Sequence, residues 1–425
     1  FAPRLTSCRR ARALRRCCCR SQASTAAPPA MLRGVGRSVG ALALCWAEAA
    51  EAAPDISASL AMLPQDAGDE SPACLDGSPF GAYLRKSATN STKWTAYIQG
   101  GGWCYHEAEC AQRALTGLGS SKNWPGQAEC RCMNAMEDGS LDGDCNCVVL
   151  PYCDGASFTG FRPKPWPAPG GAPGLYFRGI KNLDAAMDFA FAAGLGGATE
   201  FVLTGESAGG LATFLHADRV AAQVSQRAPG CQHIVAAPNV GFFLDHDDYA
   251  HDEKNYTAYM KYVYGMQNLT FGPDGGLHPA CGAAFPESQH YCFMSPHMQR
   301  FVQTPLFVLN SKYDDWQIAE ELHTRAAAAV ETYGADFMEA FRPMLENPRK
   351  NGAAITSCVC HGCDFGHLQV DGQSALRWYA EWYLGKTQGA ASFHVDPRGP
   401  NGDGALRAPL CKGLEGAAGG LEVHV

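Results

Sequence analysis

The chain has 425 residues, 46% of them hydrophobic, which is enough for one large α/β domain or two smaller ones. Its formal net charge is −8, but nine of its 34 basic residues and only two of its 42 acidic residues lie in residues 1–53. The remainder therefore carries 25 basic and 40 acidic side chains, a net charge near −15. Such an acidic body argues against nucleic acid or an anionic membrane as a partner.

The first 53 residues have the composition of a leader. Residues 1–30 are rich in Arg, Ala and Ser, and we expect disorder there, or an incorrectly assigned gene start with Met31 as the true one. After Met31 come a basic stretch, a short apolar run at 39–47 and small residues up to Ala53. This pattern predicts a signal peptide within 31–53, with an organelle transit peptide as the alternative. The apolar run is too short to span a bilayer, so we expect no stable membrane insertion.

Cysteine content also favours secretion to a cell wall or matrix. Fifteen of the 20 cysteines lie from Cys74 onward, several of them in Gly- and Asp-rich sequence typical of loops. In an oxidising compartment such density predicts disulfides, whose connectivity the sequence leaves open. Zinc is the alternative, but the C-x-C pairs at 130–132 and 145–147 lack the usual C-x2-C spacing, so we expect no metal and no cofactor. Sequons at Asn90, Asn255 and Asn268 fit a secreted glycoprotein.

Strands and helices alternate beyond residue 90. We predict strands at 93–99, 148–152, 201–204, 234–238 and 305–310, and helices at 178–193, 211–222, 318–333 and 376–384. Residues 54–90 are interpreted as a lead-in, 103–150 and 161–175 as loops, and 241–300 as an insertion rich in aromatic residues. The alternation predicts one α/β domain at 54–387, with a mainly parallel sheet, helices on both faces and cysteine-rich loop insertions. Residues 388–425 are expected to form a loose, Gly-rich tail.

The segment from Gly205 to Gly209 fits G-x-S-x-G between a predicted strand and a predicted helix. This is the context of a nucleophile elbow, in which a tight turn exposes the serine at the end of a sheet strand. A Cβ at either glycine would clash with neighbouring backbone, which explains the residue type. Ser207 is therefore the candidate nucleophile; the alternative is a Gly-rich turn with an incidental serine.

A serine nucleophile needs an acid and a base, which follow it in this order along such a fold. Asp314 or Asp315 lies at the end of the predicted strand 305–310, and one of them could instead cap the following helix. The candidates among the later histidines are His361 and His367, followed by His394 and His424. We favour His361 as the base, because disulfides at the flanking cysteines would hold its loop in place. His367 is the alternative.

Gly100–Gly101–Gly102–Trp103 follows an early predicted strand, the place of the glycine-rich oxyanion loop in esterases. Glycines allow backbone N–H groups to approach the substrate closely. We expect one donor from Gly102 or Trp103 and another from Ala208, the residue after the nucleophile. The alternative is a simple β-turn.

Four motifs together resemble the plant pectin acetylesterases and the related Notum carboxylesterases: Gly-Gly-Gly-Trp-Cys at 100–104, Gly-x-Ser-Ala-Gly-Gly at 205–210, Tyr-Asp-x-Trp-Gln at 313–317 and Ser-Cys-x-x-His at 357–361. The similarity covers roughly residues 70–386. It implies a secreted serine esterase of α/β-hydrolase-like fold that needs no metal, with Ser207 as nucleophile, Asp314 rather than Asp315 as acid, and His361 as base. Gly102, Trp103 and Ala208 are implied to line the oxyanion hole. The extra cysteines beside His361 depart from the pattern.

The plant-type motifs favour an acetylated polysaccharide such as pectin as the substrate of a monomeric enzyme. A Notum-like esterase that removes a fatty acyl group from a protein is the alternative within the family. Outside it, a non-catalytic carbohydrate-binding protein would be expected to have lost a triad residue, and a serine peptidase would cleave peptides rather than acetyl esters. Aromatic residues of the insertion could stack on sugars or simply pack as core or lid.

Overall fold

The computed structural model describes residues 56–400 except 66–69, 142, 172, 250–254, 273–274 and 347–349. The predicted leader and signal peptide, and the tail beyond residue 400 with His424, lie outside the described residues. No helix in the described ranges has both the length and the apolar character needed to cross a membrane.

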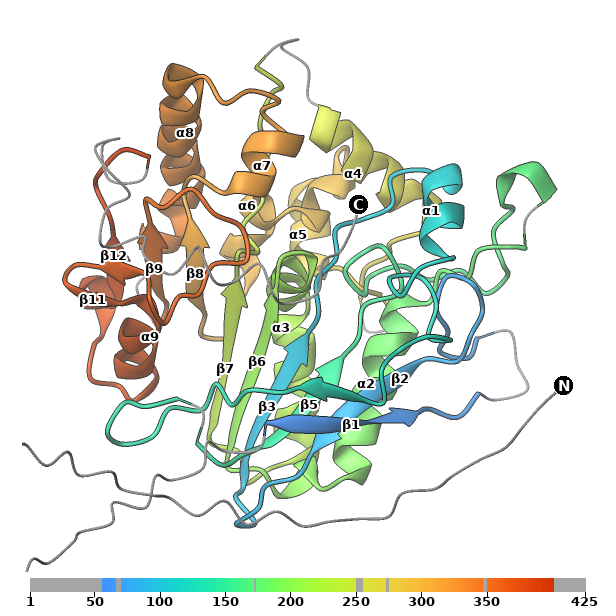
Figure 1. Cartoon of the computed structure of the whole chain (residues 1–425), viewed down its shortest axis with the longest axis horizontal. Helices are drawn as coiled ribbons and strands as arrows, with labels where there is room; N and C mark the ends of the chain where they lie inside the picture. Colours follow the sequence, from blue (N-terminus) through green and yellow to red (C-terminus); the bar gives the residue numbers. More distant parts are fainter. Residues whose placement is uncertain are drawn as a thin grey trace, which may run out of the picture. The chain divides into compact units, whose positions relative to one another are not determined.

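A ten-stranded sheet organises the described residues, with the order β12-β9-β8-β7-β6-β3-β5-β2-β1-β4 (Figure 1). The strands are β1 (Ser57–Met62), β2 (Gly81–Arg85), β3 (Lys93–Ile98), β4 (Gln127–Glu129), β5 (Asn146–Leu150), β6 (Glu200–Glu206), β7 (His233–Asn239), β8 (Phe307–Ser311), β9 (Gly352–Thr356) and β12 (Phe393–Val395). From β12 to β5 all neighbours are parallel, while β2, β1 and β4 add an antiparallel edge. The parallel strands are buried on both faces, which explains their continuous apolar sequences.

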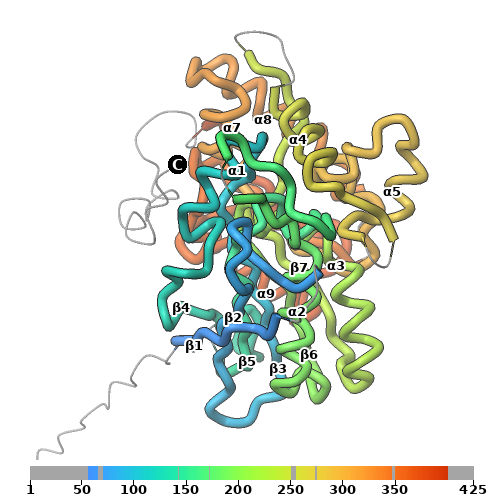
Figure 2. The backbone as a smooth tube through the Cα atoms, turned by 90° about the vertical axis from the view of Figure 1, so that its right-hand side faces the viewer, coloured from blue at the N-terminus to red at the C-terminus, as the bar shows by residue number. Residues whose placement is uncertain are grey.

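Helices cover both faces of this sheet (Figure 2). The apolar sides of α2 (Gly179–Ala192), α3 (Ala208–Arg227) and α8 (Ala327–Glu346) join one core cluster with residues such as Leu203 of β6. On the other face, α9 (Ala375–Tyr383) packs against the side that carries Val202. Neighbouring residues of β6 thus face opposite cores, as the pleat requires. The predicted α/β class with a mainly parallel sheet is confirmed.

Several expected loops contain regular structure. The lead-in 54–90 holds β1 and β2, and the insertion 241–300 holds α4 (Asn255–Met266), α5 (Pro279–Ala284) and α6 (Ser295–Met298). The helix predicted at 318–333 is two helices, α7 (Asp315–Glu320) and α8, because the chain turns between them with His323 at φ 53°.

The expectation of a loose tail from residue 388 is wrong for the part that the structure describes. β12 pairs in parallel with β9 and extends the sheet. Beyond the strand, Asp396 accepts a hydrogen bond from Ser357 Oγ at 2.6 Å and forms an ion pair with Arg398. The bond to Ser357 attaches this segment to the residues that follow β9.

Disulfides, rather than zinc ligands, account for the paired cysteines. The described residues include the bonds Cys74–Cys153, Cys104–Cys110, Cys130–Cys147, Cys132–Cys145, Cys281–Cys292 and Cys360–Cys363. The two C-x-C pairs bond to each other and join β4 to β5. In the same ranges no group of three or more His, Cys, Asp and Glu side chains is arranged to hold a metal ion.

Candidate active site

Ser207 lies between β6 and α3 in a tight turn. Its φ is positive, with φ 58° and ψ −126°, a conformation that a serine adopts only where the surroundings enforce it. A Cβ on Gly205 would lie 2.4 Å from the Gly209 carbonyl oxygen, and one on Gly209 would lie 2.1 Å from that of Ile98. Both glycines are therefore required by close backbone packing, as predicted for a nucleophile elbow.

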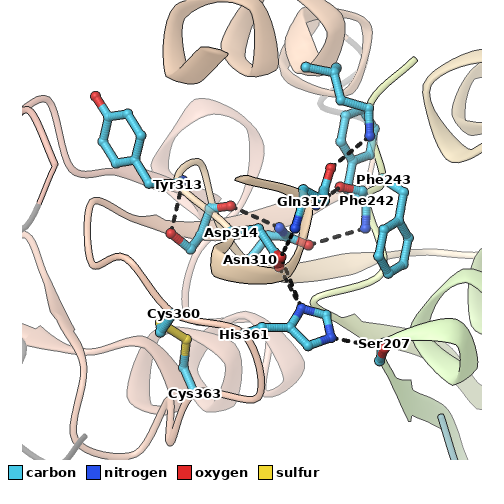
Figure 3. A network of polar contacts seen from close by, with 12 residues as sticks. Ser207, Phe242, Phe243, Asn310, Tyr313, Asp314, Gln317, Cys360, His361 and Cys363 are labelled. Carbon is cyan, nitrogen blue, oxygen red and sulfur yellow. Dashed lines mark hydrogen bonds and ion pairs between the residues drawn. A yellow bond between two sulfur atoms is a disulfide. The ribbon is translucent and has the colours of Figure 1, made fainter. Parts of the chain in front are cut away.

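The structure brings three predicted residues together at the carboxyl ends of β6, β8 and β9 (Figure 3). His361 Nε2 lies 2.9 Å from Ser207 Oγ. On the other side of the ring, His361 Nδ1 lies 2.8 Å and 3.0 Å from the two carboxylate oxygens of Asp314. Since a carboxylate can only accept, Nδ1 carries a proton and Nε2 is free to accept the serine proton in neutral histidine. The Cys360–Cys363 disulfide closes a short loop around His361.

Asp314 and Asp315 differ sharply in their surroundings. Asp314 is fully buried, and in addition to contacting His361 it caps α7 by accepting the Gln317 N–H at 3.1 Å. Asp315 is half exposed and pairs with Arg325 at 2.5 Å. Of these two aspartates, Asp314 is the one that contacts His361.

The other histidines lie elsewhere. His367 is largely exposed and pairs with Asp364 at 2.6 Å. His394 stacks on Trp378 with ring centroids 3.5 Å apart. Of the described candidates only His361 contacts Ser207 Oγ.

The glycine-rich loop after β3 lies directly on the elbow. A Cβ on Gly100 would be 2.2 Å from the Glu206 carbonyl oxygen, and Gly102 is left-handed at φ 65°. Arg113 of α1 (Glu107–Arg113) donates to the carbonyls of Gly101 at 2.7 Å and Trp103 at 2.8 Å. These two bonds fix the positions of the loop carbonyls. The N–H of Ala208 opens α3, where the first donors have no intrahelical partner.

Sequence reasoning missed a buried loop that supports this region. Ser157 Oγ accepts a hydrogen bond from the Trp103 indole N–H at 2.9 Å and donates to the Ala208 carbonyl at 2.8 Å. It therefore links the two segments that carry the predicted oxyanion donors. Asp154 Oδ2 accepts the N–H groups of Ala156 and Phe158 and shapes the loop. The run Asp154-Gly-Ala-Ser157 carried no signal beyond its turn-like composition.

Carboxylates set the electrostatics of His361. Burial by itself lowers the pKa of His361, but the Asp314 carboxylate raises it, and the Glu206 carboxylate adds to this, so that the net pKa is above the ordinary value. Glu206 accepts a hydrogen bond from the Tyr97 hydroxyl at 3.3 Å. Nearby, burial first and then the charge of Asp314 raise the pKa of Glu321 well above its usual value.

An aromatic cluster lies beside the imidazole. It comprises Trp103, Phe243, Tyr256 and Trp316, with neighbouring ring centroids 4.8–6.5 Å apart. Phe243 and Trp316 each lie 6.2 Å from the His361 ring. Gln317 fixes one side of the cluster, because its side-chain amide donates to the Phe242 carbonyl and accepts from the Leu244 N–H.

Fold and site together define an α/β-hydrolase-like protein with a hydrogen-bonded Ser–His–Asp arrangement on an elbow. The family model described as Pectinacetylesterase matches residues 52–383, and the chain belongs to that family. Pectin acetylesterase 11 of Arabidopsis thaliana is 28% identical over 338 residues, covering 72% of this chain and 78% of that protein. Pectin acetylesterase 5 of the same plant is 31% identical over 252 residues, with 59% and 56% covered.

Notum proteins are also similar. The human palmitoleoyl-protein carboxylesterase NOTUM is 26% identical over 280 residues, covering 64% of this chain and 54% of that protein. The solved structure of the Drosophila Wnt deacylase Notum matches with a TM-score of 0.68 at 22% identity, covering 81% of this chain and 98% of that chain. At this identity the structural match supports the fold alone.

Proposed function

We propose that this protein is a serine carboxylesterase that removes acetyl groups from an acetylated polysaccharide such as pectin. The observation that carries the proposal is the continuous set of hydrogen bonds from Asp314 through His361 to Ser207 Oγ. Family membership adds the acyl-ester chemistry, since relatives are named as pectin acetylesterases and as carboxylesterases.

In the proposed reaction, His361 Nε2 takes the Ser207 proton as the serine oxygen attacks the ester carbonyl. Asp314 orients the imidazole and stabilises the imidazolium. The proton then passes to the sugar oxygen as its bond to the carbonyl carbon breaks, so that the sugar leaves as a free hydroxyl and an acetyl group stays on Ser207. Water attacks this acyl-enzyme through the same histidine, and acetate is released.

The negative oxygen of the tetrahedral intermediate requires donors that are already in place. We assign this role to the N–H of Ala208 and to that of Gly102 or Trp103. Each such donor lowers the barrier by roughly 3 kcal/mol in well-studied hydrolases. Arg113 and Ser157 hold the two segments in place through their hydrogen bonds to Gly101 and Ala208.

A short acyl group is favoured over a fatty one. The rings beside His361 are packed against one another, and Trp103, Phe243 and Tyr256 are buried. An acetyl methyl group needs little space beside these packed rings, which supports a short acyl group. The Notum-like removal of a fatty acyl group is therefore the second candidate. Among the described residues, no contact favours peptide cleavage.

The proposal includes export through the secretory pathway. Six disulfides among the described residues require an oxidising compartment. The predicted sequons at Asn90 and Asn268 are exposed, as glycan acceptors must be.

Replacing the nucleophile tests the proposal. We expect wild-type protein to release acetate from acetylated pectin and to hydrolyse p-nitrophenyl acetate faster than p-nitrophenyl palmitate. Ser207→Ala should lose this activity by a factor of at least about 10³ while its thermal unfolding is unchanged, because the covalent step is lost. Asp315→Asn, next to the acid, is the matched control and should retain activity. Full turnover by Ser207→Ala would exclude the assignment, and a preference for palmitate would select the Notum-like alternative.

A further inference from the structure

A row of contacts leads away from the glycine-rich loop along α4. Alternate residues after β3 contact every third residue of α4, in the pairs Trp103–Tyr256, Tyr105–Tyr259 and Glu107–Tyr262. The first pair belongs to the aromatic cluster at the active site. The second is a stacked pair with centroids 4.9 Å apart, and in the third the tyrosine hydroxyl donates to both carboxylate oxygens at 3.0 Å.

Exposure increases along this row. Tyr256 is buried, whereas Tyr259 and Tyr262 are 44% and 48% exposed. A helix rises 1.5 Å per residue, so Tyr262 lies about 9 Å along α4 from Tyr256. Figure 1 and Figure 2 show α1 and α4 at the end of the sheet where the parallel strands terminate. The row therefore runs from the candidate nucleophile toward solvent.

A groove of about 450 Å³ lies at the exposed end of the row, lined by Glu107, Trp166, Lys261, Tyr262 and Met266 among others. Trp166 donates its indole N–H to Glu107 at 3.2 Å. Because Tyr262 donates to the same carboxylate, two aromatic side chains are bonded to one charged group.

Two positively charged side chains, Lys261 and Arg162, lie at the groove, although residues 54–425 carry a net negative charge. Lys261 lines the groove, and the Arg162 guanidinium lies 4.0 Å from the centre of the Trp166 ring. Arg162 is fixed there by bonds to the carbonyls of Gly265 and Met266. Local positive charge favours a ligand that bears carboxylates.

We propose that this groove binds the chain of a uronate-containing polysaccharide while its acetyl ester lies at Ser207. A sugar ring has an apolar face that stacks on an aromatic ring, and a rim of hydroxyls that bonds to a carboxylate or an ammonium group. Trp166 and Tyr262 supply the rings, Glu107 the acceptor and Lys261 the partner of a uronate. The polymer is thus held at a second point, a short oligosaccharide away from the ester. This inference rests on the proposed function, because it concerns the same substrate.

Direct binding tests the groove separately from catalysis. Acetylated pectin fragments are titrated calorimetrically into Ser207→Ala protein, and into the same protein with Tyr262→Ala, Lys261→Met or Tyr249→Ala. Tyr249 is 59% exposed and lies outside the row, so its variant is the matched control. We expect Tyr262→Ala to weaken binding about tenfold, the effect of one lost stacking contact, and Tyr249→Ala to leave it unchanged. Lys261→Met should weaken binding of pectin fragments more than that of neutral acetylated xylan fragments.

Thermal unfolding of each variant checks that the fold is intact. Absence of binding to Ser207→Ala protein, or equal affinities of the Tyr262→Ala and Tyr249→Ala proteins, would overturn the inference, as would displacement of the glycan by unrelated peptides. Hydrolysis of p-nitrophenyl acetate by wild-type protein reports on the proposed function alone. If esters are hydrolysed but Tyr262→Ala binds normally, only the groove is wrong. If glycan binding depends on Tyr262 but no ester is cleaved, only the proposed function is wrong.

Discussion

Asp314 illustrates how much one buried side chain can hold together. The sequence suggested that one aspartate caps the helix while its neighbour serves the histidine. In the structure Asp314 does both, because its Oδ1 accepts the Gln317 N–H while both oxygens face His361. The carboxylate that caps the start of α7 therefore also orients the imidazole. Burial distinguishes the two aspartates, and burial of a single charged residue cannot be deduced from its neighbours in sequence.

Glu206 offers a test of the electrostatics at this scale. Its carboxylate is close enough to the His361 loop that a Cβ on Gly362 would lie 3.0 Å from Glu206 Oε1. Burial lowers the pKa of His361, while Asp314 and then Glu206 raise it above its usual value. The esterase reaction needs neutral His361, so activity must fall as the pH drops through this raised pKa. We expect Glu206→Gln to lower the pKa of His361 and to move the acidic limb of the activity profile to lower pH.

The measurement is kcat/KM for p-nitrophenyl acetate as a function of pH. Asp315→Asn is the comparison, because Asp315 contributes less to the same pKa and should move the limb less. A limb that stays in place or moves to higher pH in Glu206→Gln would contradict the assignment of His361 as the base.

Among the elements, the loop at 152–158 is the clearest support of the site. Ser157 and Phe158 are both left-handed, at φ 52° and 60°, although neither is glycine. Such conformations persist where surrounding contacts enforce them, and they gather at functional sites. Here the Tyr152 hydroxyl accepts the Ser157 N–H and the buried His216 bonds to the Ser157 carbonyl.

We expect Ser157→Ala to reduce kcat about tenfold, because a slightly displaced oxyanion donor stabilises the transition state less well. It should also lower the free energy of unfolding by about 1–2 kcal/mol, since the Trp103 indole N–H is left without its partner. Steady-state kinetics and urea unfolding measure the two effects. Ser140→Ala, at an exposed serine outside the loop at 152–158, is the control. A Ser157 variant with unaltered kcat would show that the loop does not position the donors.

Sequence patterns located the elements that carry the site better than those that support it. The strands before Gly100, Ser207 and Asp314 were predictable because fully buried parallel strands read as short apolar runs. β1 and β2 were missed, since their sequences, SASLAM and GAYLR, lack such runs. His361 was predictable from its position after Ser207 and Asp314 in the chain and from the cysteines that flank it. Ser157 and Arg113 reach the glycine-rich loop only once the chain has folded. Their types and spacing carried no signal.

At the scale of the molecule, disulfides differ in the length of chain they close. Cys74–Cys153 spans 79 residues, whereas Cys104–Cys110 spans six. If restriction of the unfolded chain dominates, the first bond contributes roughly 4 kcal/mol and the second about 2 kcal/mol. Urea unfolding of the Cys74→Ala/Cys153→Ala and Cys104→Ala/Cys110→Ala double variants should show this order. Equal losses would mean that local packing outweighs chain entropy.

The edge strand β12 belongs to the folded domain although it lies outside the matched family region. It follows the matched family region, which ends at residue 383, yet it covers the edge of β9. Just beyond it, Asp396 bonds to Lys312 Nζ through its carbonyl at 2.8 Å and to Ser357 Oγ through its carboxylate, and these partners precede Asp314 and His361. The tail thus ties the loop of the acid to the loop of the base.

Anyone who shortens the gene for expression should keep this tail. A protein ending at residue 387 would retain Ser207, Asp314 and His361, so its sequence motifs would all be present. We expect it to be less active and less soluble than one ending at residue 400, because its two loops are untied and β9 offers an open edge for aggregation. The two proteins are compared by their soluble yield and by their turnover of p-nitrophenyl acetate. Equal values would show that the tail beyond residue 387 is not needed for activity or solubility.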